Sequence, residues 1–217
     1  MFRLMCLFLF AAITFSQAQT TVEISDSARE RIFMPYDLPY FIDATNQLPF
    51  KLVSSDDFLN RFQKHSSYQN IDFETNASYW IRIPIKPNPN STKVWLLEFY
   101  DQTIDTLEAY IPQRDGSFKK IEMGDHHLFQ HRNFSHKNFE VVVDKRGDGV
   151  QPYYFKVRSH EFADVRVALR SVDRFIYYAL NEYYLYGMFY GMILIITVYN
   201  FLVFIAIREI KFIGLGR

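Results

Sequence analysis

The sequence lacks the residues that would define a disulfide-bonded protein or a nucleotide-binding enzyme. Its single cysteine, Cys6, lies near the N-terminus. The rest of the chain therefore cannot form a disulfide and needs a hydrophobic core large enough to fold without one. There is no glycine-rich phosphate loop, and there is no long linker, repeat or low-complexity tract. The sequence indicates no cofactor.

An excess of one charge is also missing, because the chain has 24 Lys and Arg against 24 Asp and Glu. Residues 19–182 carry 20 basic and 23 acidic side chains, so they are slightly acidic. Nucleic-acid-binding domains usually show a basic excess, which argues against a nucleic-acid partner. The 22 Phe and 15 Tyr residues exclude a disordered chain, and 217 residues suffice for about one domain.

Residues 1–18 have the features of a secretory signal peptide. Arg3 provides the positive start, residues 4–15 are apolar and uncharged, and Ser16, Gln17 and Ala18 precede the expected cleavage site. The alternative is a membrane anchor, but about twelve apolar residues are too few to span a bilayer. We therefore expect export of the chain.

Residues 183–207 form an uncharged run that is long enough to cross a membrane. A buried core helix is the alternative, although soluble helices rarely run so far without a charged face. Arg208 and Lys211 follow the run, and positive charge stays inside. We expect a juxtamembrane helix at 173–182, a transmembrane helix at 183–207, a cytoplasmic tail at 208–217, and residues 19–172 outside as one domain.

Two glycines in the apolar run, Gly187 and Gly191, lie four residues apart on one helical face. Small residues at this spacing let a second helix approach closely. They equally fit the general tolerance of membrane helices for glycine. A homodimer and a partner membrane protein are both compatible with this pattern.

Between these ends, apolar and polar residues alternate with a period of two, as in half-buried strands. Turn residues separate the runs, and their short spacing favours an antiparallel sandwich. We expect one helix at about 56–64 and a second from about Ser171 into the membrane. Seven strands are predicted around residues 81–85, 95–99, 107–111, 121–123, 139–143, 153–157 and 165–169.

Several motifs in one order resemble the second type of extracellular domain of the bacterial seven-transmembrane receptors with diverse intracellular signalling modules. They are LPYFID (38–43), NASYWIRIPI (76–85), WLLE (95–98), DTLEAYIP (105–112), HRNF (131–134), YYFKVRS (153–159), YGMFYGM (186–192) and YNF (199–201). The resemblance covers about residues 36–212, which includes the first membrane helix of the family.

This resemblance implies a mainly β, jelly-roll sandwich similar to carbohydrate-binding modules, followed by one transmembrane helix. It implies a bacterial inner-membrane location, with a sensor domain facing the periplasm. Members continue through six more membrane helices to a kinase, cyclase or phosphatase module, whereas this sequence stops at Arg217. We interpret the chain as truncated, with a separate partner supplying the rest as the alternative, and we expect no enzymatic activity of its own.

Strand parity suggests where a sugar could bind. If the isoleucines of 81–85 face the core, Trp80 and Arg82 project from the opposite face, as do Glu108 and Tyr110. Exposed aromatic rings cover the apolar face of a sugar, and charged groups meet its hydroxyls. The alternatives are that the helix near Asp56 covers Trp80, and that Arg82 and Glu108 form a cross-strand ion pair.

Other chemistry has weaker support in the sequence. His126, His127, His131 and His136 fall close together, but they lack the paired spacing and the cysteines of structural zinc sites. We interpret them as part of a solvated loop and expect no metal site. Asp and Glu are numerous, but no motif marks a glycosidase pair.

The sequence therefore predicts a membrane receptor domain that binds a small molecule, most simply a saccharide, and moves its stalk helix when occupied. A membrane-held binding module without signalling and an assembly partner of another membrane protein are the alternatives. If the binding hypothesis holds, Trp80→Ala should abolish binding without unfolding the domain. Loss of the fold instead would place Trp80 in the core.

Overall fold

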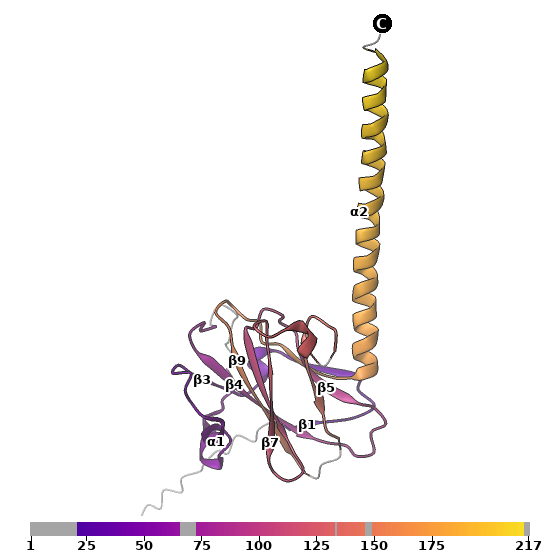
Figure 1. Ribbon diagram of the computed structural model, residues 1–217. Coiled ribbons are helices and arrows are strands. Elements are labelled where there is room, and N and C mark those ends of the chain that lie inside the picture. Colours follow the sequence, from indigo (N-terminus) through magenta and orange to yellow (C-terminus); the bar gives the residue numbers. More distant parts are fainter. Residues whose placement is uncertain (1–20, 66–72, 133, 146–148, 215–217) are drawn as a thin grey trace, which may run out of the picture.

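The computed structural model describes residues 21–65, 73–132, 134–145 and 149–214. The predicted signal peptide at 1–18 lies outside the described residues. The described chain is a β-sandwich from which one long helix extends (Figure 1). The predicted fold class, mainly β followed by one apolar helix, is confirmed.

Two sheets form the sandwich. The first sheet has the order β1-β4-β9-β6-β7, and β3 also pairs with β4. Its strands are β1 (Val22–Glu23), β3 (Tyr40–Asp43), β4 (Ser78–Lys86), β6 (Thr106–Pro112), β7 (Phe118–Met123) and β9 (Gln151–Arg158). The second sheet has the order β2-β10-β5-β8, with β2 (Glu30–Phe33), β5 (Trp95–Phe99), β8 (Phe139–Val143) and β10 (Val167–Ser171).

All the described strand pairs are antiparallel except β1 with β4, which is parallel. The order is compatible with a jelly roll. Each of the seven predicted strands is present, although the last begins at Val167 rather than Val165. The short strands β1, β2 and β3 were not predicted, because two to four residues are too few to show a period of two.

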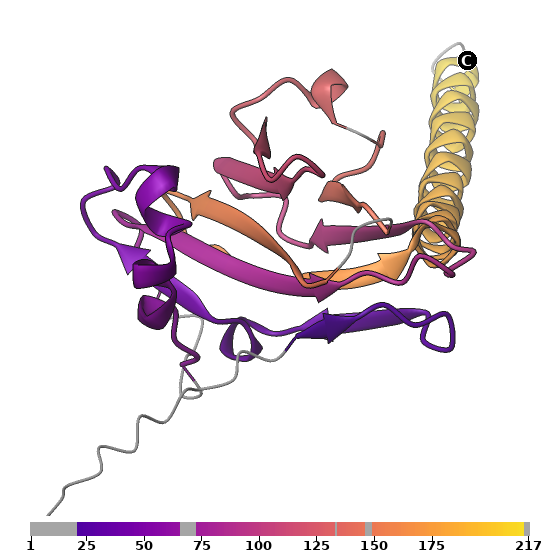
Figure 2. The ribbon, with the colours of Figure 1, turned by 90° about the horizontal axis from the view of Figure 1, so that it is seen from below.

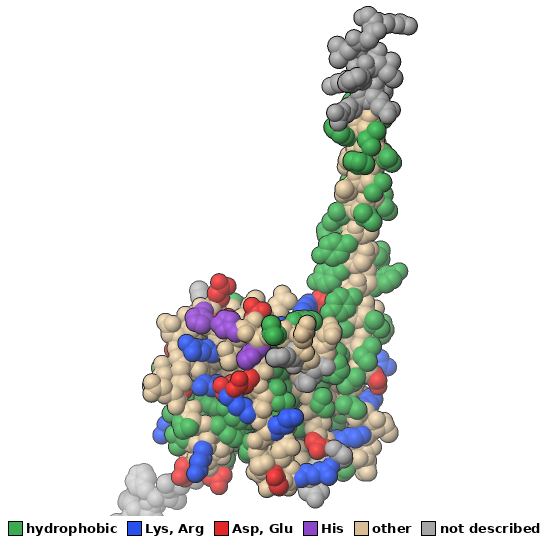
Figure 3. Space-filling model, in the orientation of Figure 1, with side chains coloured by type: hydrophobic (Ala, Val, Ile, Leu, Met, Phe, Trp, Pro, Cys, Tyr) green, Lys and Arg blue, Asp and Glu red, His purple; other side chains and the backbone are tan. Residues whose placement is uncertain are grey.

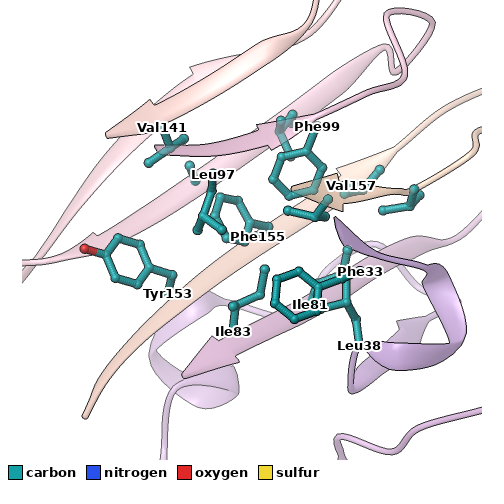
Figure 4. Packing of buried hydrophobic residues seen from close by; sticks show 14 of the residues in the cluster. Phe33, Leu38, Ile81, Ile83, Leu97, Phe99, Val141, Tyr153, Phe155 and Val157 are labelled. Atoms are coloured by element: carbon teal, nitrogen blue, oxygen red, sulfur yellow. The ribbon is translucent and has the colours of Figure 1, made fainter. Parts of the chain in front are cut away.

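The main core lies between the two sheets, where inward residues of both interdigitate (Figure 4). Ile81 and Ile83 of β4 lie in the same buried cluster as Leu97 and Phe99 of β5, with Phe155 between them, so they face the core as the alternation predicted. Burying each such side chain contributes roughly 1.5–3 kcal/mol. These contacts offset the lack of disulfides in the described chain.

Short helical segments connect the strands. The predicted helix at 56–64 is instead a 3-10 helix, η2 (Asp56–Arg61), which follows the four-residue α1 (Phe50–Val53). The other segments are the 3-10 helices η1 (Pro35–Asp37) and η4 (Phe129–His131). Figure 2 shows α1 and its neighbours at the end of the sandwich far from the long helix.

Gly124 allows two loops to meet at one end of the first sheet. Its φ is +129°, and a Cβ at this position would lie 2.2 Å from the carbonyl oxygen of Asp105. A side chain there would therefore push the loops apart. The loops are joined by backbone hydrogen bonds from Asp125 N to Ile104 O (2.8 Å) and from His126 N to Asp105 O (3.2 Å).

The long helix α2 (Val172–Gly214) begins directly after β10, with no residue between strand and helix. Its part Val172–Ile207 is long and apolar enough to cross a membrane. The predicted juxtamembrane segment 173–182 and span 183–207 are therefore parts of one helix. Figure 1 shows that this helix extends well beyond the sandwich.

Candidate ligand-binding site and the junction with α2

The four predicted site residues lie on the outer face of the first sheet, in two rows across β4, β9 and β6. Trp80 and Glu108 are both register partners of Lys156. Arg82 and Tyr110 are both register partners of Tyr154. The structure thus brings the four residues together on one face, as strand parity suggested.

Trp80 and Tyr110 are covered rather than exposed, with 1% and 9% of their surfaces accessible. Phe50 of α1 stacks on the Tyr110 ring at a centroid distance of 3.9 Å, and Phe58 of η2 belongs to the same buried cluster. We call this cluster the outer aromatic core; its members are Val53, Phe58, Phe62, Trp80, Tyr110 and Tyr154, with Phe41, Leu48, Phe50 and Phe118 packed against it. An open aromatic platform is therefore absent from this part of the described sheet.

The indole of Trp80 carries a buried donor. Its Nε1 has no hydrogen-bond partner among the residues that the structure describes. Above the ring lies Lys156, whose Nζ is 5.4 Å from the ring centroid and donates to the Asn46 carbonyl oxygen. The segments α1 and η2 thus pack over the ring, while the N–H has no hydrogen-bond partner within the described part of the chain.

Glu108 and Arg82 occupy opposite ends of this face and do not form an ion pair with each other. Glu108 accepts a hydrogen bond from the Tyr110 hydroxyl at 2.6 Å and lies 3.1 Å from Lys120 Nζ. Burial and this hydrogen bond raise the pKa of Tyr110. Arg82 donates instead from Nε to the Tyr154 hydroxyl at 3.3 Å.

Arg82 also lines a cleft of about 190 Å³ beside the outer aromatic core. Arg31, Lys64 and Asp37 contribute the other charged side chains, and Phe33, Leu38 and Pro39 lie among its apolar walls. The cleft is smaller than a typical drug-sized pocket. Three cations and one anion favour a small ligand that carries hydroxyl or carboxylate oxygens.

A second polar cluster, which the sequence analysis did not identify, lies on the outer face of the other sheet. Glu98 of β5 and Glu140 of β8 are register partners, and both are buried. Arg170 of β10 lies 3.1 Å from Glu98, to which Asn138 donates at 2.6 Å. The signal available in the sequence was a glutamate at an outward position of each of two neighbouring predicted strands.

Burial sets the ionisation of this cluster. It raises the pKa of Glu98, and together with the nearby Glu98 charge it raises the pKa of Glu140 to about 8. Burial lowers the pKa of His136, whose Nε2 is 3.7 Å from Glu98. The positive charge of Arg132, in the loop before β8, opposes this rise in the pKa of Glu140.

The base of α2 covers this cluster. Arg170 lies between the rings of Tyr100 and Tyr178, each 5.0 Å from its guanidinium carbon. His136 Nδ1 is 3.1 Å from the Tyr183 hydroxyl, and Lys137 pairs with Glu182. The helix is therefore held to the sandwich up to the residue at which the predicted span begins.

Gly187 and Gly191 lie beyond this contact, on the exposed part of α2. A Cβ at either position would meet nothing within 4 Å. The polar side chains of this part bond to their own helix, from Thr197 to Ile193 O and from Asn200 to Ile196 O. This face is open to a second helix.

A two-sheet sandwich joined directly to a helix that is long and apolar enough to cross a membrane is the arrangement expected of a membrane-anchored domain. The family model of the 7TMR-DISM extracellular 2 domain matches residues 36–171. The chain belongs to this family, as its motifs predicted. It is an extracellular sensor-type domain of a membrane receptor. No curated protein matches the chain.

Replacing Trp80 by alanine should destabilise the domain, because the ring is buried and its removal leaves a cavity. We expect Trp80→Ala to lower the free energy of unfolding by about 3–5 kcal/mol. Trp80→Phe should cost much less, since it keeps most of the packing and removes an N–H for which the described residues provide no partner. Urea unfolding followed by the fluorescence of Trp95 measures both; unchanged stability of Trp80→Ala would mean that the ring is exposed.

Glu140 should make the domain less stable as the pH rises. The pKa of this carboxyl is about 8 in the folded state and near 4.5 in the unfolded state. Its stabilisation of the folded state is therefore complete below pH 4.5 and is lost as the pH rises through 8. Between pH 5 and 8 we expect a loss of roughly 2–4 kcal/mol that Glu140→Gln abolishes. Urea unfolding at each pH measures it. Glu161→Gln, on an exposed loop, should keep the wild-type dependence; the same dependence in Glu140→Gln would contradict this account.

Proposed function

We propose that the chain is the carbohydrate-sensing part of a bacterial inner-membrane receptor, with its sandwich in the periplasm. The family membership and the apolar helix support a sensor at a membrane. The orientation rests on the sequence, in which Arg208 and Lys211 follow the apolar run. The proposal assigns no catalytic step to the chain.

The observation that carries the signalling role is the direct passage from β10 into α2. β10 lies inside the second sheet, between β2 and β5, and its last residue Ser171 precedes the first helical residue Val172. A linker would absorb a change in the sandwich before it reached the membrane. Without one, any displacement of β10 moves or rotates the helix.

We place the ligand in the cleft at Arg82. A guanidinium offers several donors in a fixed plane, which suits the hydroxyls of a sugar or the carboxylate of an acidic sugar. The Tyr154 hydroxyl accepts from Arg82 Nε and so orients the guanidinium. In this proposal Trp80 and Tyr110 support the face from within the outer aromatic core, and Glu108 is a polar contact at its far rim.

The open face at Gly187 and Gly191 favours a second role in the same receptor. Close approach of two helices there would join two copies of the chain, or this chain and a partner membrane protein. In such a pair, a movement of α2 would be transmitted to the second helix. An assembly partner without a ligand is the competing function.

Glycan-array binding by the full chain in lipid nanodiscs tests the proposal. We expect binding to a defined class of saccharides and a loss of about tenfold or more in affinity for Arg82→Gln, because one charge-assisted hydrogen bond contributes about 1.5–3 kcal/mol. Arg114→Gln, an exposed arginine on another loop, should bind like the wild type.

The two parts of this proposal fail separately. Absence of binding to any glycan would contradict a saccharide ligand and favour the assembly role. Binding that Arg82→Gln leaves unchanged would contradict the cleft as the site while retaining the ligand class. Thermal unfolding of each variant identifies losses that come only from misfolding.

A further inference from the structure

Three potential metal ligands converge at one end of the first sheet. Asp105 immediately precedes β6, His126 follows β7, and His160 follows β9. The strands β9, β6 and β7 are neighbours, and β6 runs antiparallel to the other two. The start of β6 and the ends of β7 and β9 therefore lie at the same end of the sheet. Figure 3 shows histidine side chains (purple) grouped near the top of the sandwich, to the left of α2.

The distances fit a shared ligand. His126 Nε2 is 3.7 Å from Asp105 Oδ1, and His160 Nδ1 contacts Asp105 Oδ2. One ligand atom of each of the three residues lies within 4.8 Å of the others. The spacing of His126, His127, His131 and His136 did not predict this group, because two of its members come from other loops.

The backbone holds the carboxylate and both loops in place. His160 N donates to Asp105 Oδ2 at 2.7 Å, and His126 N donates to the Asp105 carbonyl oxygen. Gly124 permits the close approach of the His126 loop. The group is thus arranged before any ligand arrives.

We propose that Asp105, His126 and His160 form a binding site for a divalent transition-metal ion of the zinc class. Two imidazoles and one carboxylate are a donor set suited to zinc, and hard cations such as Mg²⁺ prefer oxygen ligands alone. The side chains of His126 and His160 are 61% and 66% exposed, against 17% for Asp105. The ion enters from solvent, and water completes its coordination.

The bound ion links the start of β6 to the ends of β7 and β9. These strands carry Glu108, Tyr110 and Tyr154 of the proposed ligand-binding face. The site lies at the opposite end of β6 from Pro112 and takes no part in the cleft at Arg82. Metal binding is therefore a second input to the domain, independent of the saccharide.

Calorimetric titration of zinc into the tag-free, chelator-treated full chain in nanodiscs tests this site. We expect one ion per chain, and a loss of about tenfold or more in affinity for His126→Ala and for His160→Ala. Zinc should also raise the thermal unfolding temperature of the wild type, because it binds the folded state. Magnesium should do neither.

His127→Ala is the matched control, because His127 lies on the same loop outside the group and should keep wild-type affinity. Cobalt substitution adds a spectroscopic readout: d–d absorption should appear in the wild type and be lost in His160→Ala. Absence of zinc binding, or binding that His126→Ala and His160→Ala leave unchanged, would overturn the proposal. The side chains of His126 and His160 are already mostly exposed, so replacing them by alanine should not unfold the domain.

Discussion

The structure depends on one buried interaction, the pairing of Arg170 with Glu98 under the base of α2. Neither side chain reaches solvent: Glu98 faces Arg170 and accepts a hydrogen bond from Asn138, and Arg170 also lies beside the tyrosine rings and 3.4 Å from Glu30 of β2. Removing one partner of such a pair leaves an uncompensated buried charge, which costs about 3–5 kcal/mol. The helix that covers the pair is therefore fixed in position by the sheet beneath it.

This constraint explains why the base of α2 is packed firmly against the sandwich. Arg170 belongs to β10, the strand that continues into α2, so the charge pair lies next to the point where strand becomes helix. The loop at His136 and Lys137 adds contacts to Tyr183 and Glu182. On the opposite sheet, the outer aromatic core places Arg82 at a cleft. A ligand bound at that cleft, as we propose, would therefore contact the same two-sheet sandwich that holds the helix.

The sequence alone predicted the elements that repeat a clear pattern. The alternation of Ile81, Ile83 and Ile85 identified β4 and its inward face, and the uncharged run identified the apolar part of α2. It offered the cover of Trp80 by the segment near Asp56 only as an alternative, and it did not predict the part of Phe50, because that cover is a tertiary contact between segments without a period. Nor could spacing join Asp105 to His160, since sheet order sets that contact. The glutamate pair was missed because an outward position normally implies solvent.

Hydrogen exchange measured by mass spectrometry on the full chain in nanodiscs tests the rigid junction most directly. If the buried pair and its neighbours hold α2 to the second sheet, amides at 173–182 should exchange as slowly as those of β5 and β10. Exchange of 173–182 much faster than that of the sandwich strands would contradict the account, because the helix base would then open independently of the sheet.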